Sequence, residues 1–252
     1  MSYLRIEHTG AVRTITMARP EKRNAINPEM MRELYEAFSL TPPDEERITV
    51  LRGEGAVFCA GLQLSTSGVD PREAIAIEQM FEAVQNYPLP VLAVVQGAAI
   101  AGGCELSLHC DFIVAADDAP FAMPLAQLGV STTWFLTKKL IEMAGPATTR
   151  EFLLLGEPMP GARLHELGIV TRSVPRAELD AAAQVIIDRV AANAPMSLRT
   201  MKKLIIKQMA YLFDADHREL DSEVAEVYAS EDAVEGVAAL SLIHISEPTR
   251  PY

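Results

Sequence analysis

A glutamate that follows two glycines is the clearest candidate for chemistry in this sequence. The segment comes after an apolar, β-branched run at Val91–Val95, which is typical of a buried strand. Gly102 and Gly103 predict a tight turn, and the spacing from Cys104 favours a short helix with Glu105 in its first turn. Helix N-terminal amides bind negative charge, so these groups together suit the formation and protonation of an oxyanion. On these residues alone, the helix dipole is a better reason than catalysis for a first-turn glutamate.

A second segment repeats this arrangement and makes the signal more specific. Phe58–Leu64 joins the end of an apolar strand to a turn of small residues, which frees another backbone amide. Two such turns predict an oxyanion hole with two main-chain donors.

Several segments, in this order and spacing, resemble the crotonase family, the enoyl-CoA hydratase and isomerase superfamily of acyl-CoA enzymes. They are Arg19–Asn27, Phe58–Leu64, Gly97–Leu106 with Cys110–Asp111, Phe121–Gly129 and Ser230–Gly236. The resemblance covers nearly the whole chain. It implies an α/β fold, the crotonase (ClpP-like) spiral of repeated strand-strand-helix units, followed by a C-terminal helical trimerisation region.

The resemblance also implies a set of site residues. The N–H groups of Leu62 and Gly102 would hold the thioester oxygen of an acyl-CoA, and Glu105 would act as the acid and base. Lys22 and Arg23 would lie at the adenine and phosphate end of CoA, although such turn residues are ordinarily only solvated. The other substrate-binding residues that it implies are Ala25, Ala60, Gly61, Gln63, Leu64, Gly103, Leu125, Gly129 and Trp134. We expect no cofactor apart from the CoA of the substrate, and no metal.

Position 125 departs from the family pattern. Typical hydratases carry a second glutamate directly after the proline at position 124, whereas this chain has Leu125. Two carboxylates divide the roles of general base and general acid, while a lone one must perform both. An apolar neighbour also predicts a raised pKa for Glu105. Trp134 ends a segment that replaces the usual glycine-rich loop, and it either walls the acyl pocket or packs in the core at a helix start.

The leading interpretation is hydration of a 2-enoyl-CoA to a 3-hydroxyacyl-CoA. Isomerisation, decarboxylation and thioester hydrolysis involve the same or a related oxyanion and stay open. A protein that binds acyl-CoA without catalysis is the alternative from a different class, because Leu125 and the altered loop fit lost chemistry. Asp117, Asp118 and His109 are candidate substitutes for the missing carboxylate, although the first two are typical of turns and the third of a helix end.

Composition limits the class of protein. The chain has 252 residues, 49% of them apolar, which is enough for one sizeable core with an appended helical piece. It has no apolar run of about eighteen residues and no basic leader, so we expect a soluble, cytoplasmic protein without a signal peptide. Cys59, Cys104 and Cys110 lack zinc-ligand spacing and are interpreted as free thiols. A net charge of −12 argues against nucleic acid and anionic membranes as partners.

Strand and helix patterns alternate over residues 1–193 and predict an α/β core that contains the acyl-CoA site. Strands are expected at Tyr3–Glu7, Val12–Met17, Ile48–Arg52, Val91–Val95, Asp111–Ala115 and Gly168–Val170. Helices are expected from Pro28 after an Asn27 cap, from Pro71 to about Asn86 after an Asp70 cap, and at Trp134–Met143, Pro146–Leu155, Ala162–Leu167 and Pro175–Asn193.

Residues 194–240 show only helical patterns and form the expected oligomerisation region. Lys202, Lys203 and Lys207 make a basic stripe that is by default a solvated face. The resemblance implies a homotrimer or a hexamer built as a dimer of trimers, so the apolar faces of these helices are interpreted as subunit contacts.

The last twelve residues form an anomalous segment. Residues 241–252 lose helical periodicity, so the helix that Ser230 opens is expected to stop at Leu240. The segment resembles a translated transposase adapter from shotgun sequencing, and we interpret it as a non-native tail. A divergent natural tail is the alternative, and neither interpretation gives His244 a function.

Overall fold

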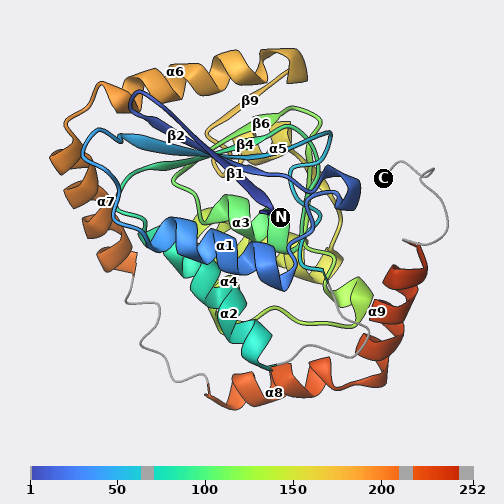
Figure 1. Cartoon of the computed structure of the whole chain (residues 1–252). Helices are drawn as coiled ribbons and strands as arrows, with labels where there is room; N and C mark the ends of the chain where they lie inside the picture. The colour runs from blue at the N-terminus through green and yellow to red at the C-terminus, as the bar shows by residue number, and fades with distance from the viewer. Residues whose placement is uncertain (1, 64–70, 210–217, 244–252) are drawn as a thin grey trace.

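The computed structural model describes residues 2–63, 71–209 and 218–243, and a six-stranded sheet forms its centre (Figure 1). An antiparallel hairpin of β1 (Leu4–Thr9) and β2 (Val12–Met17) opens the sheet, as predicted. The sheet continues in parallel through β3 (Ile48–Gly53), β4 (Val91–Val95), β6 (Phe112–Ala116) and β9 (Arg172–Val174). Every residue of β4 is buried, which explains its unbroken apolar sequence.

Helices cover both faces of this sheet (Figure 1). On one face lie α1 (Pro28–Ser39), α2 (Pro71–Asn86), α3 (Gly102–Leu108) and α4 (Trp134–Arg150), and α6 (Leu179–Ala191) covers the other. Alternate residues of β4 serve the two cores: Val91 and Ala93 pack toward the first set of helices, Leu92 and Val94 toward α6.

A small second sheet carries the start of α3. It consists of β5 (Ala99–Ile100), β7 (Pro120–Ala122) and β8 (Met159–Pro160), in the order β5-β7-β8. Because β5 follows β4 after a short turn and leads directly into α3, this sheet fixes the segment in which chemistry was predicted.

The local signals for helix starts are largely confirmed. Asn27 caps α1, since its side chain accepts a hydrogen bond from the Met30 amide at 2.9 Å. Asp70, the other expected cap, lies outside the described residues. The two helices expected on either side of Gly145 are the two halves of α4, which is broken at this glycine, where φ is 68°. The chain then passes into a π-helical turn, η3 (Glu151–Leu155).

The strand predicted at Gly168–Val170 was wrong. After α5 (Gly161–Glu166) the amides of Ile169 and Val170 both donate to the Leu164 carbonyl, at 2.9 and 3.1 Å, and form a turn. Both side chains are buried, so their apolar character reflects core contact, and β9 begins only at Arg172. The helix expected from Pro175 also starts later, with a 3₁₀ turn, η4 (Arg176–Glu178), before α6.

The C-terminal region consists of α7 (Pro195–Met209), α8 (Arg218–Tyr228) and α9 (Glu231–Ile243). The interpretation of Lys202 as part of a solvated stripe was wrong, because its side chain is buried. Its Nζ donates to the Leu89 carbonyl (3.1 Å) and to Asp111 Oδ2 (2.6 Å), which ties α7 to the sheet. The expected helix end at Leu240 was also wrong: α9 continues to Ile243, and no proline or glycine follows Leu240 before Pro248.

None of the helices within the described ranges combines the length and the apolar character needed to cross a bilayer. Of the predicted tail, residues 241–252, the part after Ile243 lies outside the described part of the chain.

Candidate active site

Two main-chain turns meet beyond the carboxyl ends of β3 and β4. The Cys59 amide donates to the Ala98 carbonyl at 3.1 Å, and the Ile100 amide donates to the Cys59 carbonyl at 3.0 Å. The approach is close, because a Cβ added to Gly103 would lie 2.2 Å from the Cys59 oxygen. The predicted pair of turns is therefore present, and glycine at position 103 is required by backbone contact.

The amides of Leu62 and Gly102 lie close together at this junction. A Cβ added to Gly102 would stand 3.3 Å from the Leu62 nitrogen and 2.9 Å from Leu62 Cγ, so the absence of a side chain leaves space beside the Leu62 N–H. Neither amide donates to a carbonyl within the described residues. Two neighbouring free donors of this kind suit an oxygen that gains negative charge.

The sharp turn before α3 lies one residue earlier than predicted. Ala101, and neither glycine, has φ of 48° with ψ of −117°, and α3 begins at Gly102 rather than at Cys104. The Ala101 amide donates to the Ala122 carbonyl at 2.8 Å, and the Ala101 carbonyl accepts from the Glu105 amide at 3.0 Å. Positive φ in a non-glycine residue costs about 1–3 kcal/mol, and here these bonds hold it.

Glu105 is fully buried in the first turn of α3. Neither carboxyl oxygen has a hydrogen-bond partner within residues 2–63, 71–209 and 218–243. Burial raises the pKa of Glu105 to about 8, an effect that the charge of Lys139 partly opposes. The predicted upward shift is confirmed, and a carboxyl group with this pKa can both accept and donate a proton near neutral pH.

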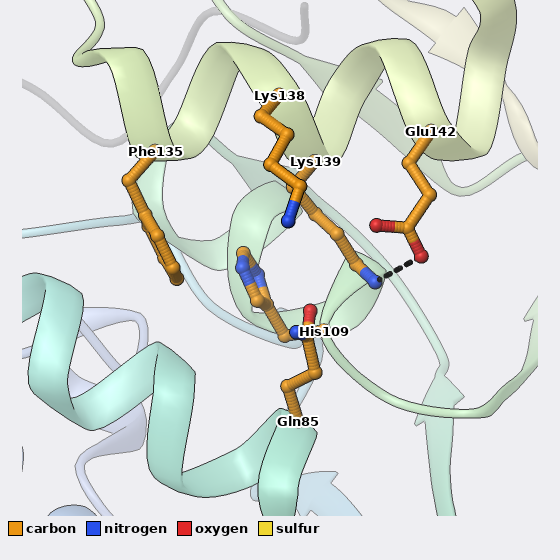
Figure 2. Close-up of a pocket in the computed structure, with 6 residues that line it drawn as sticks. All are labelled: Gln85, His109, Phe135, Lys138, Lys139 and Glu142. Carbon is orange, nitrogen blue, oxygen red and sulfur yellow. Dashed lines mark hydrogen bonds and ion pairs between the residues drawn. The ribbon is translucent and has the colours of Figure 1, made fainter. Parts of the chain in front are cut away.

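A narrow pocket lies at the C-terminal end of α3 (Figure 2). His109 faces it, and the other lining residues are Gln85 of α2 and Phe135, Lys138, Lys139 and Glu142 of α4. Lys139 Nζ pairs with Glu142 Oε1 at 3.1 Å. Burial, together with the charges of Lys139 and Lys138, lowers the pKa of His109 to about 3. The imidazole is therefore neutral, and its 4.0 Å approach to Glu105 Oε2 is not a contact between opposite charges.

The predicted CoA loop is joined to the turn that carries the Leu62 amide. Lys22 and Arg23 are exposed, and the Arg23 carbonyl accepts from the Ala60 amide at 3.0 Å. Two further bonds run from the Ile26 amide to the Gly61 carbonyl and from the Gln63 amide to the Ile26 carbonyl, each 2.8 Å long. Half-buried Ala25 lies within the same loop. The structure thus brings these predicted site residues against one another.

Two residues that the sequence analysis did not single out hold this loop. Asn24 has φ of 55°, and its side-chain amide donates to the Val57 carbonyl at 2.9 Å and to the Phe58 carbonyl at 3.2 Å. The Arg19 guanidinium donates to the Ala25 carbonyl at 2.6 Å and to Gln63 Oε1 at 3.1 Å. Asparagine tolerates left-handed backbone conformations, so Asn24 after a turn was the available signal.

The remaining predicted site residues are Leu125, Gly129, Trp134 and Leu64. Leu125 is half-buried and packs against the main core, and Trp134 begins α4. Gly129, with φ of 65°, faces α9, since a Cβ there would lie 2.5 Å from the Asp232 carbonyl carbon. Its predicted contact with substrate stays a prediction, and Leu64 lies outside the described residues.

The other candidate acids are structural. Asp117 and Asp118 lie in the turn after β6, as predicted. Asp117 accepts from the Ser173 hydroxyl at 2.6 Å, and Asp118 pairs with Arg176 at 3.2 Å. In the part of the chain that the structure describes, no three His, Cys, Asp or Glu side chains are grouped so as to hold a metal ion.

An α/β fold with the amides of Leu62 and Gly102 close together, and a buried, protonatable glutamate in the helix turn that Gly102 opens, defines a site suited to oxyanion chemistry. The sequence profile of the enoyl-CoA hydratase/isomerase family matches residues 7–241, and the chain belongs to this family.

Individual proteins support this assignment. The chain is 31% identical to a probable enoyl-CoA hydratase of Rhizobium meliloti, with 95% of each chain covered. It is also 31% identical to the carnitinyl-CoA dehydratase of Escherichia coli, covering 94% of this chain and 95% of that one. A crystal structure of methylmalonyl-CoA decarboxylase complexed with 2S-carboxypropyl-CoA superposes with a TM-score of 0.86, at 25% identity and 96% coverage of both chains. The crotonase fold expected from the sequence is confirmed.

Proposed function

We propose that this chain hydrates a 2-enoyl-CoA thioester to a 3-hydroxyacyl-CoA. The observations that carry the proposal are the neighbouring amides of Leu62 and Gly102, which donate to no carbonyl among the described residues, and the buried Glu105 in the same helix turn as Gly102, whose pKa is about 8. Names of relatives with hydratase and dehydratase activity support the same reaction class.

The reaction follows from these groups. The Glu105 carboxylate removes a proton from water, and the water oxygen bonds to Cβ of the enoyl group. The double-bond electrons move onto the thioester, and the two amides stabilise the resulting enolate oxygen. The protonated Glu105 then gives its proton to Cα, so H and OH are added and the carboxylate is regenerated. Exposed Lys22 and Arg23 suit the CoA phosphates.

Leu125 favours a second candidate reaction. A decarboxylation needs the oxyanion hole but no activated water, so it does not require a second carboxylate, and a structural relative of this chain is named as a decarboxylase. In that case the carboxylate of a 2-carboxyacyl-CoA leaves as carbon dioxide, and the enolate is protonated at Cα. Acyl-CoA binding without catalysis is the third possibility.

Mass spectrometry of a small panel of CoA thioesters tests the proposal on the full chain. A 2-enoyl-CoA should gain the mass of one water, and Glu105→Gln should lower this rate about 10³-fold while CoA binding is kept. Loss of carbon dioxide from a 2-carboxyacyl-CoA would instead support the second candidate. Retention of all thioesters without any change of mass would overturn both.

Leu125→Glu tests the interpretation of the missing carboxylate. If one carboxyl group limits hydration, this variant should raise the rate about tenfold or more, whereas Leu125→Gln, of matched size and without charge, should not. Equal rates in the two variants would show that a second carboxylate is not what limits the reaction.

We further propose a trimeric or hexameric, cytoplasmic protein in which α7 lies at subunit contacts. Four apolar side chains of α7 are largely exposed, namely Met196 (73%), Met201 (51%), Leu204 (58%) and Ile205 (63%). Exposed apolar surface of this kind supports burial against another subunit, which sedimentation equilibrium would measure.

A further inference from the structure

His109 is held in one orientation at the end of α3. Its ring stacks on Phe81 of α2 at 5.0 Å and on Phe135 of α4 at 5.4 Å between ring centres, each at an interplanar angle of 15°. Its Nδ1 lies 2.8 Å from the main-chain oxygen of Glu105. Because a carbonyl oxygen only accepts, Nδ1 carries the hydrogen. The ring is therefore fixed on both faces and at one edge.

The same nitrogen faces the carboxyl group of Glu105. Nδ1 lies 4.0 Å from Glu105 Oε2. His109 is 2% exposed, so water does not compete for the hydrogen. A side-chain rotation of Glu105 that brings Oε2 within hydrogen-bond range would let Nδ1–H be shared, as a three-centre bond, between Oε2 and the main-chain oxygen that it already contacts.

The reaction creates a need for such a donor. When Glu105 ionises to act as a base, it becomes a buried carboxylate, which is costly without a hydrogen bond. Leu125 offers none. We propose that His109 is a positioning residue for Glu105, and that its Nδ1–H, shared with the Glu105 main-chain oxygen, donates a hydrogen bond that orients the ionised carboxyl group between proton transfers. This inference rests on the proposed function of Glu105.

The charged groups around the ring fit this role. On α4 they are Lys138, Lys139 and Glu142; on α3 the titratable neighbour of Glu105 is Cys104, and the pocket residue of α2 is the uncharged Gln85. Figure 2 shows both lysines of α4 beside the imidazole, with Lys139 paired with Glu142. Burial, together with the charges of the two lysines, disfavours a positive charge on the ring, so His109 acts as a neutral donor. A neutral donor stabilises the carboxylate without preventing its reprotonation.

Three substitutions separate a positioning role from a packing role. His109→Asn places an amide nitrogen near the position of Nδ1, whereas His109→Gln places it near Nε2, and both lose the stacked ring. His109→Phe keeps an aromatic ring between Phe81 and Phe135 and removes both nitrogens. Loss of a hydrogen bond to a charged group should lower kcat about tenfold in the Phe and Gln variants, with KM little changed, and the Asn variant should stay within about threefold of the parent.

The pH dependence of kcat/KM gives an independent readout. A lost donor disfavours the ionised form of Glu105, so the limb that reports its ionisation should move to higher pH in the Phe and Gln variants and stay in place in the Asn variant. A packing role would give the opposite order, with Phe closest to the parent and Asn equal to Gln, and would overturn the inference. If neither amide variant folds, parent-like kcat and pH profile in the Phe variant overturn it, and a tenfold loss with the shifted limb supports it.

The parent and Glu105→Gln distinguish failure of the proposed function from failure of the positioning role of His109. No turnover by the parent, or full turnover by Glu105→Gln, overturns the proposed function and this inference together. An active parent, an inactive Glu105→Gln and equal Asn and Gln variants overturn the inference alone.

Discussion

Two buried glutamates of this protein are treated in opposite ways. Glu46 is 2% exposed, and its Oε1 accepts from the Thr49 hydroxyl at 2.7 Å and from the Tyr87 hydroxyl at 2.9 Å, with Arg13 Nε at 3.5 Å. Glu105 is 0% exposed, and no group within the described ranges bonds its carboxyl. The protein thus pairs the carboxyl group of Glu46, whereas it leaves unpaired that of Glu105, the proposed acid and base.

The largest expected loss of stability comes from removing the cation that pairs with Glu46. Arg13→Met leaves Glu46 buried without its cation and also removes the bond from Arg13 to the Ala37 carbonyl (2.9 Å), so the free energy of unfolding should fall by about 3–5 kcal/mol. Urea denaturation measures this change. Turnover per folded molecule should be unchanged, because the pair lies outside the candidate site.

Arg5→Met is the matched control. Arg5 lies on the neighbouring strand and pairs with Glu54 at 3.2 Å, but its side chain is 52% exposed. Its loss should change the free energy of unfolding by less than about 1 kcal/mol. Equal losses in the two variants would show that burial does not distinguish the pairs.

The unpaired carboxyl group of Glu105 should make the stability of the protein depend on pH. The folded pKa of Glu105 is about 8 against an ordinary 4.5, so the folded state binds an extra proton between these values. Its contribution is therefore fully present below pH 4.5 and is lost as pH rises toward 8. His109 has a folded pKa of about 3 against 6.5 and contributes the opposite slope below pH 6.5. The window from pH 6.5 to 8 isolates Glu105.

Within that window the parent should lose about 2 kcal/mol of unfolding free energy relative to Glu105→Gln, which cannot ionise. Denaturation of both proteins at several pH values measures the difference. Parallel curves would mean that Glu105 ionises in the folded state as it does in the unfolded state, and would remove the contrast with Glu46.

The Lys202–Asp111 pair is intermediate between the buried pair of Arg13 and the exposed pair of Arg5. The Lys202 side chain is 8% exposed while its partner Asp111 is 25% exposed, so water shares in the pair. Lys202→Met should cost about 1–2 kcal/mol of unfolding free energy, and Lys203→Met, on the exposed side of α7, less than about 0.5 kcal/mol. Thermal unfolding compares them, and a neutral Lys202→Met would place this lysine with the surface pairs.

Features encoded within a few residues could be predicted from the sequence. The apolar run of β4, the Asn27 cap and the break at Gly145 each depend on local residue types, and the structure has all three. The meeting of the Leu62 and Gly102 turns required the family resemblance, because the two turns are far apart in the chain.

Features that depend on distant partners could not be predicted. Lys202 is buried because Asp111, 91 positions earlier, lies beside it. Ala101 adopts its positive φ because β7 and the first turn of α3 bond to it from opposite sides. Ile169 and Val170 have the composition of a strand, yet they fill the core from a turn. Residue type alone carries none of this information.

The bonds between residues 19–27 and the segment at residues 57–63 have an evolutionary consequence. Since Arg19, Asn24 and Ile26 fasten one segment to the other, an insertion in the first would displace the Leu62 amide as well. The proposed CoA-binding residues Lys22 and Arg23 and the Leu62 amide must then be inherited together, as one unit. In the proposed site, a change of acyl-chain preference would then arise from substitutions around Leu125 and Trp134, which can alter the fit and leave that unit unchanged.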